Sequence, residues 1–178
     1  MAIKFATGTQ SYPGNTVLHS EKSLNNNSYV QWNSIPAGVQ RIDISFMNVS
    51  HNHSDAQTLI QIGDSSSGIL TGGYTGTWMH QNLSGGAGGR QNSNGFEFYQ
   101  RSAAYTGHGI AHLVLHDDGN TDYWVCTMTV GQTPSGYEHV IYGGGWRSMT
   151  GGYSLDRVRF SVNYGSFDNG QATLSYSW

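Results

Sequence analysis

Eight histidines give this chain its most obvious potential for metal chemistry. His51, His53 and Asp55 are spaced by two, so on a β-strand their side chains would share one face. Two histidines and one carboxylate can hold a transition metal. The segment 50–55 is polar, however, and has the composition of a turn between two strands, where such side chains are solvated. We therefore expect no metal here.

A second histidine series has a spacing of four, at His108, His112 and His116. On a helix these side chains would stack on one face, but Gly107 and Gly109 favour a strand instead. Residues four apart on a strand are about 13 Å from each other, too far for one ion. The series also lacks the glutamate that follows the first histidine of zinc proteases. We expect neither a metal nor a cofactor.

Other motifs for metal binding, phosphate binding or catalysis are excluded because the required residues or their spacing are absent. The acidic segment 117–122 lacks the ligand spacing of a calcium loop, and the glycine-rich segment 85–90 lacks the ending of a phosphate loop. No Gly-x-Ser-x-Gly elbow is present. The eleven acidic residues leave open a carboxylate pair for polysaccharide hydrolysis, but nothing selects one. The sequence predicts a protein that is not an enzyme.

The low charge of the chain excludes some classes of binding partner. Only 11% of the residues are charged, the formal net charge is −3 and the pI is near 6.2. This composition argues against binding to nucleic acid or to an anionic membrane. We also expect no signal peptide and no membrane insertion, because no apolar run is long enough. The single cysteine, Cys126, is expected to be a small buried hydrophobe in a strand.

The hydrophobic pattern predicts an all-β fold. Between Arg41 and Phe46 apolar and polar residues alternate strictly, which places Ile42, Ile44 and Phe46 on one face of a half-buried strand. Similar segments predict strands at 28–33, 39–49, 57–63, 95–99, 109–116, 122–130, 138–142, 155–164 and 171–178. The segment 117–120 predicts a hairpin turn. We expect a single jelly-roll-like β-sandwich over residues 28–178 and an extended N-terminal arm over residues 1–27.

The last predicted strand is apolar on one face up to the end of the chain. Ala172, Leu174, Tyr176 and Trp178 alternate with polar residues. Chain ends are ordinarily polar and frayed. We therefore expect this strand to be paired within a sheet and the ring of Trp178 to be buried.

Four long or glycine-rich segments are predicted as loops, at 64–78, 83–94, 131–137 and 143–153. Each combines glycine with aromatic or arginine residues, and long loops on a rigid scaffold often carry recognition. Packing between subunits, ligand contact and a plain connecting role remain open for these segments. The candidate contact residues in these loops are Tyr74, Trp78, Arg90, Trp146, Arg147 and Tyr153.

Three blocks of sequence, at 35–50, 59–74 and 155–170, resemble a module found in small structural proteins of tailed bacteriophages. The first contains Ile35-Pro36-Ala37-Gly38-Val39-Gln40-Arg41-Ile42, and the last contains Leu155-Asp156-Arg157-Val158-Arg159-Phe160. The resemblance spans residues 28–178. It implies a β-rich fold and a place on a virion, and it carries no catalytic residues.

From this resemblance we expect a non-enzymatic virion protein, made in the host cytoplasm and displayed on the particle surface. The leading expectation is a capsid decoration (cement) protein or head fibre that forms a trimer and contacts other virion proteins through aromatic loops. Interfaces favour aromatic residues and are depleted in most charges, as this chain is. The alternative is a tail-fibre tip that recognises a host-surface glycan through Tyr74, Trp78, Trp146 and Arg147. A polysaccharide hydrolase is a third, more distant alternative.

Overall fold

The structure is a computed structural model of the whole chain. It describes residues 10–12, 16–54, 56–82, 87–100, 103–117, 121–133, 139–149 and 154–178. Within these ranges the chain forms strands and no helix, and hence no helix that is long and apolar enough to cross a membrane.

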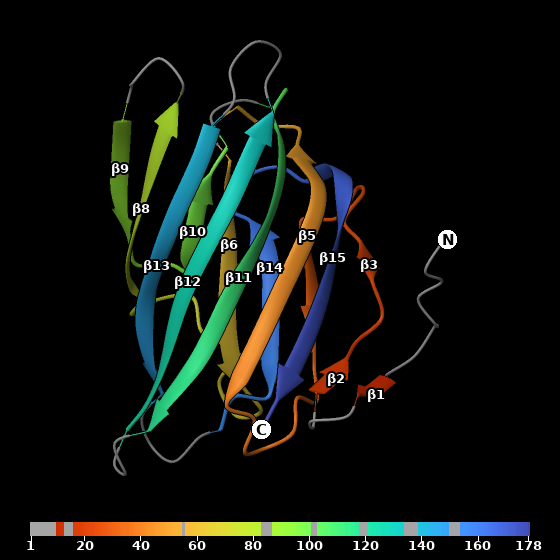
Figure 1. Cartoon of the computed structure of the whole chain (residues 1–178), viewed down its shortest axis with the longest axis vertical. Coiled ribbons are helices and arrows are strands. Elements are labelled where there is room, and N and C mark those ends of the chain that lie inside the picture. Colours follow the sequence, from red (N-terminus) through yellow and green to blue (C-terminus); the bar gives the residue numbers. More distant parts are fainter. Residues whose placement is uncertain are drawn as a thin grey trace.

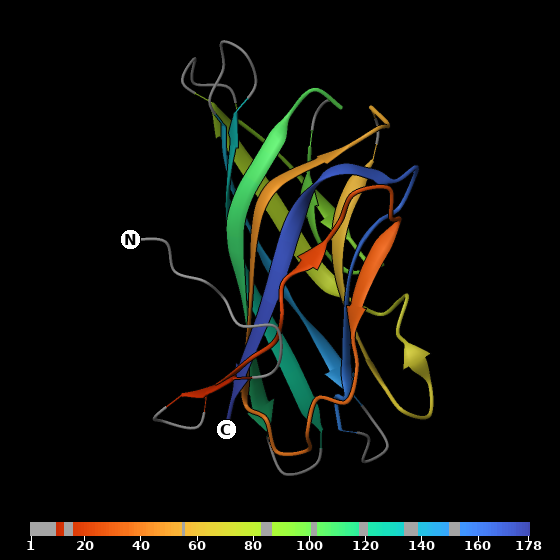
Figure 2. The ribbon, with the colours of Figure 1, turned by 90° about the vertical axis from the view of Figure 1, so that its right-hand side faces the viewer.

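Two antiparallel sheets pack face to face as a β-sandwich, which confirms the predicted fold class (Figures 1 and 2). The larger sheet has the order β1-β2-β15-β5-β11-β12-β13-β8-β9, and β3 also pairs with β15. The smaller sheet has the order β10-β6-β14-β4, and β7 pairs with β6. The strands are β1 (Gln10–Tyr12), β2 (Thr16–Leu18), β3 (Lys22–Ser23), β4 (Tyr29–Trp32), β5 (Arg41–His51), β6 (Gln57–Asp64), β7 (Gly68–Ile69), β8 (Thr75–Asn82), β9 (Ala87–Asn92), β10 (Phe96–Tyr99), β11 (Thr106–Asp117), β12 (Asp122–Thr133), β13 (His139–Met149), β14 (Arg157–Val162) and β15 (Phe167–Ser177).

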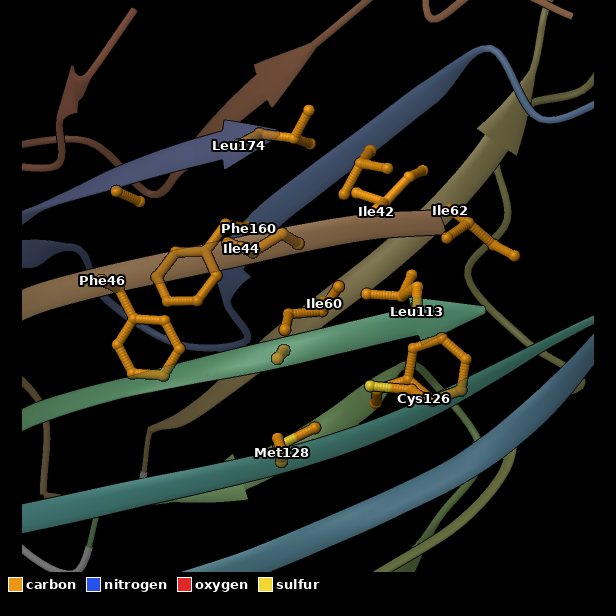
Figure 3. Close-up of a cluster of buried hydrophobic side chains, with 14 of the residues drawn as sticks. Ile42, Ile44, Phe46, Ile60, Ile62, Leu113, Cys126, Met128, Phe160 and Leu174 are labelled. Atoms are coloured by element: carbon orange, nitrogen blue, oxygen red, sulfur yellow. The ribbon is translucent and has the colours of Figure 1, made fainter. Parts of the chain in front are cut away.

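The core lies between the two sheets, as the alternation in β5 requires. Ile42, Ile44 and Phe46 of β5 are buried and meet the smaller sheet (Figure 3). The ring of Phe46 stacks on that of Phe98 in β10, with the centroids 5.1 Å apart, and lies 5.2 Å from that of Phe160 in β14. Each buried side chain of this size contributes about 1.5–3 kcal/mol through the hydrophobic effect. The inward face of β5 therefore joins the two layers.

Cys126 is a buried residue of β12, as predicted, and its side chain lies among the apolar side chains of the core (Figure 3). Burial raises the pKa of its thiol. The thiolate is the reactive form of cysteine, so this residue is suited to packing and not to nucleophilic chemistry.

The hairpin predicted around residues 117–120 is confirmed, because Asp117 at the end of β11 pairs with Asp122 at the start of β12. Residues 118–120 lie outside the described ranges. All four predicted loops are partly strand: β8 begins at Thr75, β9 spans Ala87–Asn92, β12 continues to Thr133 and β13 continues to Met149. The glycine run 143–145 is thus part of a strand, and its glycines allow β8 and β13 to approach closely. A Cβ on Gly145 would lie 2.2 Å from the carbonyl oxygen of Thr75.

The expected N-terminal arm contributes three strands, β1, β2 and β3, to the larger sheet. Leu18 of β2 pairs with Ser175 of β15, and β3 pairs with the same strand. Leu24 is fully buried, and its amide donates a hydrogen bond of 2.9 Å to the carbonyl of Gly170. The sequence pattern did not predict these strands because the segment is polar. A strand at the edge of a sheet is held by backbone hydrogen bonds to its neighbour and needs few apolar side chains. The jelly-roll connectivity stays a prediction.

The last strand is paired, but the ring of Trp178 is not buried, so that part of the prediction is wrong. β15 pairs with β5 along most of its length, and Leu174 is completely buried. The strand ends at Ser177, and Trp178 is 47% exposed. Its ring lies beside Gly38 and edge-on to Tyr176, with the centroids 5.4 Å apart. The alternation predicted the paired strand correctly, but the sequence does not tell how far the opposite layer extends.

His51 was also placed incorrectly in a solvated turn. It is the last residue of β5 and is fully buried. His53 is exposed, with its ring 5.7 Å from that of Tyr164. Asp55, the proposed carboxylate partner, lies outside the described ranges.

Candidate binding surface

The larger sheet has one face turned away from the core, formed by the outward side chains of β11, β12, β13 and β8. We call it the outer face. In β12 the alternation is strict, since Trp124 and Cys126 are buried while Val125 and Thr127 are exposed. Figure 1 looks onto this face, and no described segment lies across it. The outer face is therefore open to a partner.

Apolar side chains gather on the outer face. In the described part of the chain, ten large hydrophobic side chains are exposed. Six of them are on these four strands, namely Met79, Val114, Val125, Val140, Tyr142 and Trp146. Exposed apolar side chains that are scattered singly need no explanation, but a contiguous group of them marks an interaction surface.

The strand register arranges these side chains in rows across the sheet. In the first row, the Trp146 row, Val114 of β11 pairs with Val125 of β12, which pairs with Trp146 of β13. The neighbouring Tyr123 meets Trp146 edge to face, with the ring centroids 5.7 Å apart at 68°. This contact packs one side of the indole ring, while 42% of Trp146 stays exposed.

Two further rows follow toward the other end of the strands. In the Gly144 row, residues of β11, β12, β13 and β8 pair in succession: His112, Thr127, Gly144 and Thr77. In the Tyr142 row the corresponding residues are Ile110, Thr129, Tyr142 and Met79. Tyr142 is 49% exposed. A polar row with a glycine in it therefore separates two rows that carry aromatic rings.

Charge is confined to one border of the outer face. Within the described residues, the outward positions of β12, β13 and β8 carry no Asp, Glu, Lys, Arg or His. The border at β5 and β11 is different: Nδ1 of His112 donates to Oδ1 of Asp43 at 2.6 Å, and Nε of Arg41 donates to the same oxygen at 3.0 Å. Arg41 is half exposed, and such surface ion pairs contribute about 0–1 kcal/mol.

The histidine series of β11 lies on a strand, as its glycines predicted. Among the residues that the structure describes, no group of three or more His, Cys, Asp or Glu side chains could hold a metal ion. The Asp43 carboxylate orients the imidazole of His112, and the outward residue paired with His112 on β12 is Thr127. His112 and Thr127 therefore place hydrogen-bonding groups next to each other on the outer face.

Tyr74, a candidate contact residue, is buried and holds the molecule together. Its hydroxyl accepts a hydrogen bond of 2.8 Å from the amide of Ile62 and donates one of 3.0 Å to the carbonyl of Leu70. Its ring packs edge-on against Phe96, with the centroids 5.1 Å apart. Burial raises the pKa of its hydroxyl. Tyr74 therefore ties the 70–74 segment to β6, and with 3% of its surface exposed it offers little contact area to a ligand.

Trp78 also points inward. It is 7% exposed, and its Nε1–H donates a hydrogen bond of 3.0 Å to Oε1 of the buried Glu97. Arg90 pairs with Trp78 in the register of β8 and β9 and is exposed. Together Trp78 and Arg90 line a hollow of about 750 Å³ along this hairpin. Of the two, Arg90 alone has a side chain that solvent reaches freely.

The last three candidates differ in position. Trp146 is on the outer face, whereas Arg147, the next residue of β13, points to the opposite side and lies over the ring of Tyr74, with Cζ 5.8 Å from the centroid. Tyr153 lies outside the described residues. The structure thus brings Tyr74 and Arg147 together in the interior and leaves Trp146 alone on the outer face.

Tyr142 and Met79 are among the outer-face residues that sequence reasoning did not single out. The signal was present: Val140, Tyr142, Gly144 and Trp146 continue one period-two series, which indicates a single strand. The three glycines at 143–145 masked it, because a glycine is neither apolar nor polar in such a pattern. A hollow of about 630 Å³ also borders this region, and its lining includes Thr75, Thr77 and Gly144.

No protein-family model matches the chain, and no curated protein matches it significantly. The fold and the outer face therefore carry the functional argument.

Proposed function

We propose that the chain is a non-enzymatic structural protein of a tailed bacteriophage, displayed on the surface of the virion as a capsid decoration protein or head fibre. The observation that carries this proposal is the open outer face, a broad sheet surface of apolar and hydroxyl side chains supported by a rigid sandwich. Such a surface is suited to binding. The resemblance of the three sequence blocks to phage structural proteins adds the virion setting.

Location and copy number on the particle test this proposal. Purified virions would be labelled with gold-conjugated antibody against the chain, and its copies would be counted by quantitative mass spectrometry against the major capsid protein. A decoration protein is expected in hundreds of copies over the head. Absence of the chain from purified particles would contradict the proposal.

The second candidate is a tail-fibre tip that binds a host-surface glycan. It is favoured by one specific observation, the exposed rings of Tyr142 and Trp146 on the outer face. The same labelling experiment separates the two candidates, because a tip protein would be found in only a handful of copies at the tail.

Assembly as a homotrimer also stays a proposal. Of the two tryptophans expected at subunit contacts, Trp78 is buried within the chain and cannot serve there, while Trp146 is accessible. Light scattering at micromolar concentration measures the oligomeric state directly. A stable monomer would contradict this part of the proposal.

A further inference from the structure

Two aromatic rings are presented side by side on one strand of the outer face. Tyr142 and Trp146 both point outward from β13, and they are 49% and 42% exposed. Four residues of a strand separate their backbones by about 13 Å. Gly144, the outward position midway between them, has no side chain. The strand thus presents two rings, and the exposed backbone at Gly144 forms a shallow floor between them.

Hydroxyl groups flank this floor. Gly144 pairs with Thr127 of β12 on one side and with Thr77 of β8 on the other, and both threonines are exposed. Each threonine hydroxyl can donate one hydrogen bond and accept two. A ligand that lies over Gly144 would therefore meet rings at its ends and hydroxyls at its sides.

The order of these rows differs from that of a typical protein interface. Protein interfaces have an apolar centre and a polar rim. Here the polar Gly144 row lies in the middle, and the rows containing Trp146 and Tyr142 lie on either side of it. This order matches a ligand that alternates apolar faces with hydroxyl groups along its length.

Charge complementarity indicates that the ligand is neutral. The outward positions of β12, β13 and β8 carry no charged side chain in the described residues, so they offer no partner to a carboxylate, sulfate or phosphate. The faces of aromatic rings are negative and attract C–H groups. Sugar rings without acidic substituents have both properties, apolar C–H faces and rims of hydroxyl groups.

We propose that the outer face binds an uncharged glycan, with sugar rings against Tyr142 and Trp146 and intervening hydroxyls at Thr127 and Thr77. The proposal rests on the proposed display at the particle surface for its biological setting. Binding itself is a property of the isolated protein, so it can be tested separately from the virion location.

The test is affinity electrophoresis of the purified full chain in native gels that contain one polysaccharide each. The uncharged probes are dextran, mannan, laminarin and galactan, and the acidic probe is alginate. We expect retardation by at least one uncharged probe and none by alginate. Trp146→Ala and Tyr142→Ala should each weaken that retardation about tenfold, because each removes one ring contact.

Matched control variants come from the same chain. Trp178→Ala and Tyr164→Ala remove rings that are 47% and 60% exposed but lie away from the outer face, and they should be retarded like the wild type. Thermal unfolding of all four variants checks that each is folded.

Three results would overturn the proposal. The first is that no uncharged probe retards the wild type, and the second is that the outer-face variants are retarded as strongly as the controls. The third is that sedimentation of the glycan-free protein shows an oligomer that Trp146→Ala converts to monomer, because a second copy then covers this face. None of these results bears on whether the chain is found in virions.

Discussion

Trp78 and Glu97 form a hydrogen bond of 3.0 Å in the interior of the sandwich, with Nε1 as donor and Oε1 as acceptor. Both residues are buried, at 7% and 4% exposure. The other carboxylate oxygen of Glu97, Oε2, has no hydrogen-bond partner. Burial raises the pKa of this carboxyl group, and the bond from Trp78 and the charge of Arg90 offset part of that effect. Only one of the two carboxylate oxygens of Glu97 therefore accepts a hydrogen bond in this buried position.

Replacing this carboxyl group should make the protein more stable at alkaline pH. In the folded state the pKa of Glu97 is above its ordinary value of 4.5, so the folded protein binds more protons than the unfolded one between these two values. Stability is therefore lost as pH rises through that window. Glu97→Gln keeps an acceptor for Trp78 and removes the charge, so its free energy of unfolding at pH 8 should equal or exceed that of the wild type.

Urea unfolding of both proteins at pH 5, 6.5 and 8 measures this effect. The difference between Glu97→Gln and wild type should grow in favour of the variant as pH rises. A variant that is less stable than wild type by more than about 1 kcal/mol at pH 8, a typical hydrogen-bond contribution, would show that the ionised carboxylate stabilises the fold.

His51 should make the protein sensitive to acid. It is fully buried, and burial is the main cause that lowers its pKa below the ordinary 6.5, while the backbone of His53 and the charge of Asp168 offset part of that effect. The unfolded chain then binds more protons than the folded one below pH 6.5, so stability is lost as pH falls through that value toward the pKa of the folded state. His51→Gln removes this titration. Its unfolding free energy should fall less steeply than that of wild type between pH 6.5 and 5, whereas parallel profiles would exclude His51 as the cause.

Leu174 and Trp178 of the C-terminal segment should differ sharply in their effect on stability. Leu174 is fully buried between the sheets, so Leu174→Ala should cost about 2–5 kcal/mol. Trp178 is 47% exposed, so Trp178→Ala should cost about 1 kcal/mol or less. Urea unfolding at neutral pH measures both. A larger loss for Trp178→Ala than for Leu174→Ala would show that the terminal ring contributes more than its exposure indicates.

The sequence predicts those strands whose two faces differ in polarity. In β5 the alternation of Ile42, Ile44 and Phe46 with polar residues gave the strand and its buried face correctly, because one face meets the core and the other meets solvent. The short strands β2 and β3 escaped prediction. Pairing with β15 stabilises them, and backbone hydrogen bonds between distant segments leave no local pattern.

The candidate site was predictable in part. Trp146 was singled out, but as a loop residue, because the glycine run before it suggested a turn. Whether an aromatic residue faces the core or solvent depends on which layer lies opposite. Trp78 and Trp146 occupy adjacent strands, yet β10 covers the first and no described segment covers the second. No local sequence pattern tells which of the two tryptophans is covered by the second sheet.

The glycine run itself supplies the last prediction. Gly145 of β13 faces Gly76 of β8, and a Cβ on Gly145 would lie 2.2 Å from the carbonyl oxygen of Thr75 and 2.5 Å from Cα of Gly76. Both are backbone atoms, so the strands themselves would have to separate. We expect Gly145→Ala to cost about 1–3 kcal/mol, as overpacking does. Gly72→Ala is the control, because its Cβ would meet nothing within 4 Å, and its unfolding midpoint in urea should stay at the wild-type value. If the two variants unfold at the same midpoint, the close approach of β8 and β13 is not what requires glycine at position 145.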